Sequence, residues 1–194
     1  FDEFVNRHRF ELGLFVVADG LGGHAAGRRA SELGVAVFVE TVARDPQGSG
    51  SEVLRRAIHR ASEAIHEASR AEPGLRGMGT TLVAAVVCGS RVSIGHVGDS
   101  RCYRMRGEKF EQLTHDHSLL QEQIDSGVLT PEQAKYSLNK NLVTRALGIE
   151  AIVPADIVEY RVEANDIYLL CSDGLTDMVE PEGVQAIVDE KRLD

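Results

Sequence analysis

Residues 80–97 read TTLVAAVVCGSRVSIGHV in one-letter code, which is two apolar runs joined by Gly89-Ser90. A two-residue connection that contains glycine favours a tight turn between antiparallel strands. The stretch therefore predicts a β-hairpin formed by Thr80–Cys88 and Arg91–Val97.

A second hairpin is predicted directly after the first. Arg101–Arg106 and Lys109–Leu113 flank Gly107-Glu108, another short connection with glycine. Three further runs have the apolar content expected of strands. They are Leu14–Ala18, Asp156–Val162 and Ile167–Cys171.

Helical patterns lie between these strands. An apolar face at helical spacing runs through residues 51–68, with Ser51 as its expected N-cap. Further helices are expected over Ala25–Ala43, residues 118–147 and Pro181–Asp189. Antiparallel hairpins with helices segregated between them are typical of a layered α+β fold rather than of a parallel βαβ sheet. Because the segment 118–147 interrupts the run of strands, we expect it to be an insertion over one edge.

The composition is that of a folded, acidic protein. The chain has 194 residues, with 21 Lys and Arg against 30 Asp and Glu and a formal net charge of -9. This length suits a single domain over residues 1–194, and the acidic balance argues against nucleic acid or an anionic membrane as the main partner. Cys88, Cys102 and Cys171 lie far apart in apolar runs, which favours reduced thiols and a cytoplasmic location.

Three aspartates each end an apolar run and are followed by a small residue. They are Asp19 before Gly20, Asp99 before Ser100 and Asp173 before Gly174. If the strand ends converge, the carboxylates would repel one another strongly unless a cation lay among them. Oxygen ligands without a Cys/His cluster favour Mg²⁺ or Mn²⁺ over Zn²⁺. Spacing alone leaves open the alternative that each aspartate only caps the backbone of its turn.

A glycine-rich loop at residues 20–23 follows the first of these aspartates and leads to His24. The loop lacks the Lys-Ser/Thr of a P-loop and the spacing of a dinucleotide fingerprint, so both phosphate-binding interpretations are weak. Glycines also allow close backbone approach, which would let the Gly20 carbonyl reach a metal. His24 is a candidate general acid near that metal, and the alternative is a surface histidine at the start of a helix.

Taken together, the motifs resemble those of the metal-dependent protein serine/threonine phosphatases of the PP2C type (the PPM family), in their bacterial form. The stretches that carry the resemblance are Phe15–His24, Met78–Thr81, His96–Arg101, Leu113–Ser118, Leu142–Gly148 and Leu170–Leu175. Each is weak alone, but the ordered set is specific and covers almost the whole chain. The resemblance implies a four-layer αββα sandwich of two antiparallel sheets flanked by helices, with a helical flap at about 118–147.

The resemblance also implies a metal centre at one end of the two sheets. Carried over by position, Asp19 would bridge two Mn²⁺ or Mg²⁺ ions, the Gly20 carbonyl would bind one of them and Asp173 the other. Asp99 and Asp173 would together hold a weaker third ion. Asp19, His24 and Asp173 are then the expected catalytic residues.

The implied reaction is hydrolysis of phosphoserine and phosphothreonine in proteins by a metal-activated water, which reverses the action of a bacterial serine/threonine kinase. The expected partners are phosphorylated proteins, namely such a kinase and its substrates, and we expect a monomer. An alternative is a catalytically inactive module of the same fold that binds phosphorylated partners or acts as a scaffold. The three retained aspartates favour the enzyme.

Two motifs from the ends of the family pattern are not found in this sequence. The family's first strand carries a phosphate-binding Arg followed by Asn-(Glu/Gln)-Asp, and its last segment reads Gly-x-x-Asp-Asn. Asp2 is the expected counterpart of the first-strand Asp and a candidate metal ligand, because it lies 17 residues before Asp19. We expect the missing motifs to reflect a truncated sequence, since the internal motifs are intact.

Overall fold

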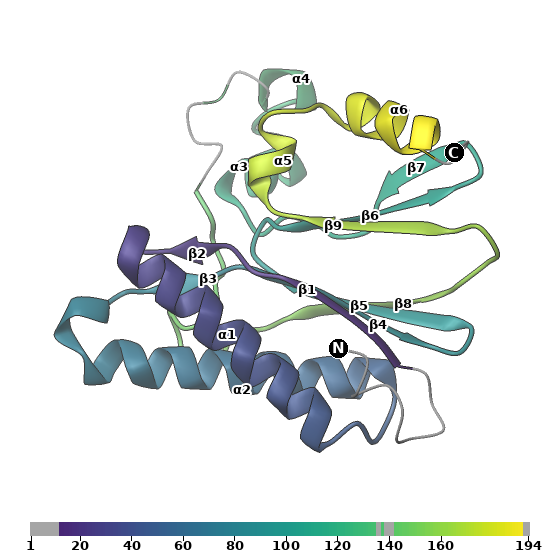
Figure 1. Cartoon of the computed structure of the whole chain (residues 1–194). Helices are drawn as coiled ribbons and strands as arrows, with labels where there is room; N and C mark the ends of the chain where they lie inside the picture. Colours follow the sequence, from purple (N-terminus) through teal and green to yellow (C-terminus); the bar gives the residue numbers. More distant parts are fainter. Residues whose placement is uncertain (1–11, 135–136, 138–141, 192–194) are drawn as a thin grey trace.

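The computed structural model describes residues 12–134, 137 and 142–191 (Figure 1). Its strands are β1 (Leu12–Val17), β2 (Gly20–Leu21), β3 (Gly79–Thr80), β4 (Leu82–Cys88), β5 (Arg91–Val97), β6 (Arg101–Arg106), β7 (Lys109–Gln112), β8 (Asp156–Arg161) and β9 (Ile167–Cys171). Its helices are α1 (His24–Arg44), α2 (Gly50–Ala71), α3 (Leu119–Asp125), α4 (Pro131–Ala134), α5 (Asp173–Thr176) and α6 (Pro181–Lys191), with the 3-10 turn η1 (Pro73–Leu75).

The strands form two main antiparallel sheets, one in the order β1-β4-β5-β8 and the other in the order β7-β6-β9. Figure 1 shows the sheets stacked, with α1 and α2 outside the four-stranded sheet and α5 and α6 outside the three-stranded one. Strand β9 contacts β1 and β4 across the interface, and the short pair β2-β3 packs against α1. The predicted four-layer αββα sandwich is therefore confirmed.

Both predicted hairpins are present. Strand β4 pairs with β5, and β6 pairs with β7, each in antiparallel register. Gly89 has φ 56° and Gly107 has φ 58° in the two turns. Glycine enters this left-handed region without the steric cost that a Cβ would impose, which explains why the connections can be so short.

Strand β4 lies at the centre of both hydrophobic layers. On the helix side, the core of α1 and α2 includes Leu82, Ala84 and Val86. On the other side, Val83 and Ala85 pack between the sheets with residues of β5, β6 and β9. Alternate side chains of a strand point to opposite faces, so a strand covered on both faces needs the unbroken apolar run that the sequence shows.

The N-cap of α2 is Ser49, and the prediction of Ser51 was wrong. The Ser49 hydroxyl accepts a hydrogen bond from the Glu52 amide, and the Glu52 carboxylate accepts one from the Ser49 amide, which completes a capping box. Because Glu52 satisfies the helix start from three residues inside it, the helix begins two residues earlier than predicted. Ser51 instead donates to Glu159 on β8 at 2.9 Å.

The segment 118–147 contains helices, as predicted, but those in its described part are short. Helix α3 begins after Ser118, whose hydroxyl accepts from the Gln121 amide, and it ends before Gly127 at φ 74°. A left-handed glycine after the last turn is a common helix stop. Helix α4 then adds only four residues.

The structure describes all three cysteines. All three cysteines are free, with Cys102 and Cys171 buried and Cys88 half-buried, in agreement with the prediction of thiols. Among the helices in the described ranges, none combines the length and apolar character needed to cross a bilayer.

Candidate metal centre

The three predicted aspartates each lie two residues after the end of a strand. Asp19 follows β1, Asp99 follows β5 and Asp173 follows β9, where it begins α5. Strands β1 and β5 both pair antiparallel with β4, so they run in the same direction and end at the same edge of the sheet. Strand β9 ends at the matching edge of the opposite sheet (Figure 1).

The carboxyl groups meet at this edge. The Asp173 carboxyl lies within hydrogen-bonding reach of Asp19, and its charge also acts on Asp99. The fold thus joins, from two sheets, the three residues that the sequence analysis singled out.

Burial and charge repulsion oppose ionisation of Asp99 and Asp173. Burial, reinforced by the charge of Asp173, raises the pKa of Asp99 to about 6. Burial, followed by the hydrogen bond and the charge of Asp19, raises the pKa of Asp173. Arg101 offsets part of the repulsion, but its guanidinium is engaged by Asp116, with Nη2 to Oδ2 at 2.6 Å. A cation among the carboxylates would compensate the part of the repulsion that Arg101 does not offset.

The donor set fits Mn²⁺ or Mg²⁺. The three converging side chains offer only carboxylate oxygens, which are the ligands that these hard cations prefer. None of the free cysteines is among them, so the chemistry of the donors disfavours Zn²⁺.

Thr81 ties the Asp19 loop to the Asp99 loop. Its Oγ1 accepts from the Asp19 amide at 3.1 Å and also forms a hydrogen bond with the Ser100 hydroxyl at 2.7 Å, in which either hydroxyl can donate. The Thr81 amide donates to the Asp19 carbonyl at 2.8 Å, and the Thr80 hydroxyl donates to the same carbonyl. These threonines belong to one of the family motifs, but their connection of the two loops was not predictable from the sequence.

Gly20, the predicted carbonyl ligand, lies against Gly27 of α1. A Cβ at Gly20 would lie 2.0 Å from the Gly27 carbonyl oxygen and 2.3 Å from its carbon. Both contacts are to backbone, which cannot move aside cheaply, so glycine is required for the loop to approach the helix. This agrees with the predicted use of glycine for close approach, while metal binding by the carbonyl stays a prediction.

Two predicted site residues have no described side-chain position. His24 is the first residue of α1, but its side chain lies outside the described part of the structure. Asp2 lies outside the described residues altogether. Their assigned roles stay predictions.

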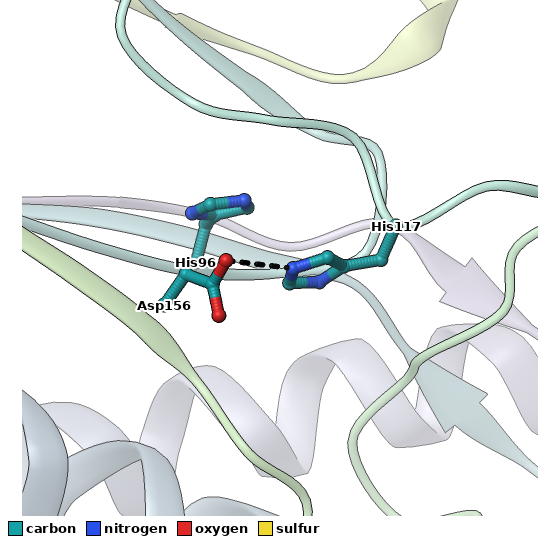
Figure 2. A group of neighbouring side chains, drawn as sticks. All are labelled: His96, His117 and Asp156. Atoms are coloured by element: carbon teal, nitrogen blue, oxygen red, sulfur yellow. Dashed lines mark ion pairs between the residues drawn. The ribbon is translucent and has the colours of Figure 1, made fainter. Parts of the chain in front are cut away.

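A second cluster was not predicted from the sequence. His96 of β5 and His117 stack with their ring centroids 4.7 Å apart, and the Nε2 atom of His117 lies 3.3 Å from an oxygen of Asp156 at the start of β8 (Figure 2). Both histidines are buried and Asp156 is exposed. Both histidines belong to the family motifs given above, but their spacing in the sequence did not predict that their side chains would be in contact.

In the metal-free protein, Asp99→Asn is expected to increase stability above pH 6. A pKa raised from 3.8 to about 6 means that ionising this carboxyl opposes folding. The penalty is absent below about pH 4, where the carboxyl is protonated in both folded and unfolded states, and is complete above about pH 6. With partial solvent screening, we expect a gain of about 1–2 kcal/mol at neutral pH. Urea unfolding of the chelator-treated protein and of the chelator-treated Asp99→Asn variant, below about pH 4 and above about pH 6, measures this gain. A difference in the free energy of unfolding that does not change with pH would contradict the explanation.

Comparison with known proteins supports the resemblance to protein phosphatases of the 2C type. The family model for protein phosphatase 2C matches residues 2–191. The serine/threonine phosphatase stp of Listeria monocytogenes is 40% identical over 183 residues, which cover 92% of this chain and 73% of that protein. The serine/threonine protein phosphatase PstP of Mycobacterium tuberculosis is 39% identical over 171 residues, 88% of this chain and 33% of that one.

Solved structures of related phosphatases share the fold of this chain, and one of them contains manganese. The crystal structure of the M. tuberculosis phosphatase PstP/Ppp superposes with a TM-score of 0.84 at 39% identity, covering 89% of this chain and 73% of that chain. A PstP catalytic domain in complex with two manganese ions superposes with a TM-score of 0.80 at 36% identity, covering 93% and 78%. With the family model spanning nearly all of the sequence and the fold in agreement with it, this chain belongs to the protein phosphatase 2C family.

Proposed function

We propose that this chain hydrolyses phosphoserine and phosphothreonine in proteins with Mn²⁺ or Mg²⁺ held by Asp19, Asp99 and Asp173. Metal-dependent protein serine/threonine phosphatase activity follows from membership of the family. The observation that supports these residues as metal ligands is the convergence of three carboxyls from three strand ends. The pKa of Asp99 and the pKa of Asp173 are both raised there.

Within the centre, Asp19, the Gly20 carbonyl and Asp173 would hold two ions, and Asp99 with Asp173 a weaker third. When bound, such cations acidify a water molecule for attack on phosphorus and neutralise the charge that develops on phosphate oxygens. The chain's own part is to keep the carboxyls together despite their repulsion. Thr81 does so by fixing the Asp19 loop to Ser100. His24 is proposed as the general acid.

The insertion at 118–147 is proposed to shape access to the centre. Its two ends are joined by the bridge between Ser118 and Val143. Two further hydrogen bonds lie near the ends of the insertion. The Thr144 amide donates to the His117 carbonyl, and the His117 amide donates to the Gly98 carbonyl, next to Asp99. These contacts lie next to Asp99, which suits a flap that meets a phosphoprotein.

The physiological setting is proposed from the family. Phosphorylated proteins are the substrates, and a serine/threonine kinase with its targets is the proposed set of partners for a monomeric, cytoplasmic phosphatase. A module that only binds phosphoproteins would have no use for three mutually repelling carboxyls, because a phosphate is itself an anion.

The assay uses a phosphothreonine peptide and a chromogenic phosphate ester with the purified protein. We expect phosphate release that needs added Mn²⁺ or Mg²⁺ and that stops with a chelator. Binding of the peptide without turnover, at saturating Mn²⁺ and with the fold intact by circular dichroism, would favour the inactive module and contradict the proposal.

A further inference from the structure

The turn that precedes Asp99 is confined from two sides. Gly98 has φ 103°, and a Cβ at this position would lie 2.7 Å from Cβ and Cγ2 of Thr81. On the other side, His117 makes two hydrogen bonds with the same residue. The His117 amide donates to the Gly98 carbonyl at 3.0 Å, and the Gly98 amide donates to Nδ1 of the His117 ring at 3.1 Å.

The second of these bonds fixes the tautomer of His117. A neutral imidazole has one nitrogen that donates and one that accepts. Because Nδ1 accepts from the Gly98 amide, the hydrogen belongs on Nε2, which faces the Asp156 carboxylate at 3.3 Å (Figure 2). Burial, together with the neighbouring His96, lowers the pKa of His117, which favours the neutral ring that this bond requires.

The same tautomer argues against a metal ion at the cluster of His96, His117 and Asp156. A metal on Nε2 of His117 would move the hydrogen to Nδ1, where it would face the hydrogen of the Gly98 amide. Histidine ligands normally donate their second N–H to an acceptor. With the hydrogen on Nε2, the Arg145 guanidinium donates from Nη1 to Oδ1 of Asp156 at 3.4 Å rather than to the ring. In addition, Nη1 lies only 3.2 Å from Nε2, so a positive charge already stands at this position.

We propose that His117 is a positioning residue for the metal centre, whose ring accepts from the Gly98 amide and thereby holds the turn that places the Asp99 carboxylate. His96 stacks on the ring with an interplanar angle of 13° and limits its rotation, and Nε2 lies 3.3 Å from a carboxylate oxygen of Asp156. The proposal rests on the proposed role of Asp99 as a metal ligand. It explains how a buried carboxyl stays beside Asp173 although the two repel each other.

Two substitutions with similar side chains distinguish the roles of the two nitrogens of the His117 ring. In His117→Asn, the side-chain oxygen can occupy the place of Nδ1 and still accept from the Gly98 amide. In His117→Gln, the amide reaches toward the place of Nε2, so contact with Asp156 can persist while the bond to Gly98 is lost. A merely space-filling role would not distinguish the two variants in this way.

The measurements are Mn²⁺ binding by calorimetry and hydrogen exchange of the Gly98 amide in metal-free protein. We expect His117→Gln to weaken the weakest Mn²⁺ site about tenfold and to speed exchange at Gly98, as fits the loss of one buried hydrogen bond. His117→Asn should keep both quantities within about twofold of the unaltered protein, because the acceptor is restored. Circular dichroism checks that both variants fold.

Asp99→Asn, measured in parallel, separates this proposal from the metal assignment. If Asp99→Asn loses the weak site while His117→Gln binds Mn²⁺ and protects Gly98 normally, the positioning role of His117 is overturned alone. If Asp99→Asn binds every Mn²⁺ ion normally, the metal role of Asp99 is overturned and the positioning role falls with it. Equal losses in the Asn and Gln variants would also overturn the proposal, because the acceptor at Nδ1 would then be irrelevant.

Discussion

Asp19→Asn is expected to lower Mn²⁺-dependent turnover of a phosphopeptide by about 1,000-fold or more while the protein remains folded. The substitution keeps the size of the side chain but removes the charge that would bridge two cations. Loss of one group that stabilises developing charge commonly costs 100- to 1,000-fold, and loss of a bridging ligand disturbs two ions at once. Steady-state kinetics at saturating Mn²⁺ measure the effect.

The matched control is Asp45→Asn, which makes the same chemical change on an exposed side chain in the loop between α1 and α2. It should leave turnover within about twofold, since surface substitutions away from special features have small effects. Turnover of Asp19→Asn within tenfold of the unaltered protein would remove Asp19 from the metal centre.

Asp173→Asn should cause a loss of similar size, and the double variant with Asp19→Asn should be scarcely worse than the more damaged single variant. The two carboxyls are within hydrogen-bonding reach and belong to one centre, so the second substitution has little left to remove. Residues that act as a unit show this strong non-additivity. Losses that multiply in the double variant would instead mean that the two aspartates work independently.

The strands were predictable because their signals are local. Gly89 and Gly107 mark the hairpin turns by their conformational freedom, and the unbroken apolar run of β4 reflects burial on both faces. The start of α2 was misplaced by two residues, since a capping box depends on a carboxylate reaching back from Glu52 rather than on the first serine of an apolar pattern. In the described part of the insertion, α3 is shorter than the composition indicated, because Gly127 ends it.

The aspartates were predictable as strand ends, but their meeting was not. It depends on β1 and β5 flanking the same strand and on the second sheet stacking with β9 at the matching edge, and sequence spacing contains neither fact. The resemblance to the phosphatase family supplied that arrangement. The bond between Gly98 and His117 joins residues 19 positions apart through one ring nitrogen, and no residue pattern encodes which nitrogen accepts.

The most direct test of the metal assignment is anomalous diffraction from crystals of the protein grown with Mn²⁺. Data collected near the manganese absorption edge distinguish each manganese ion from water and from lighter cations. We predict peaks in contact with the carboxylates of Asp19 and Asp173, and a weaker peak beside Asp99. Manganese bound at His96, His117 and Asp156, with none at the three aspartates, would contradict the assignment.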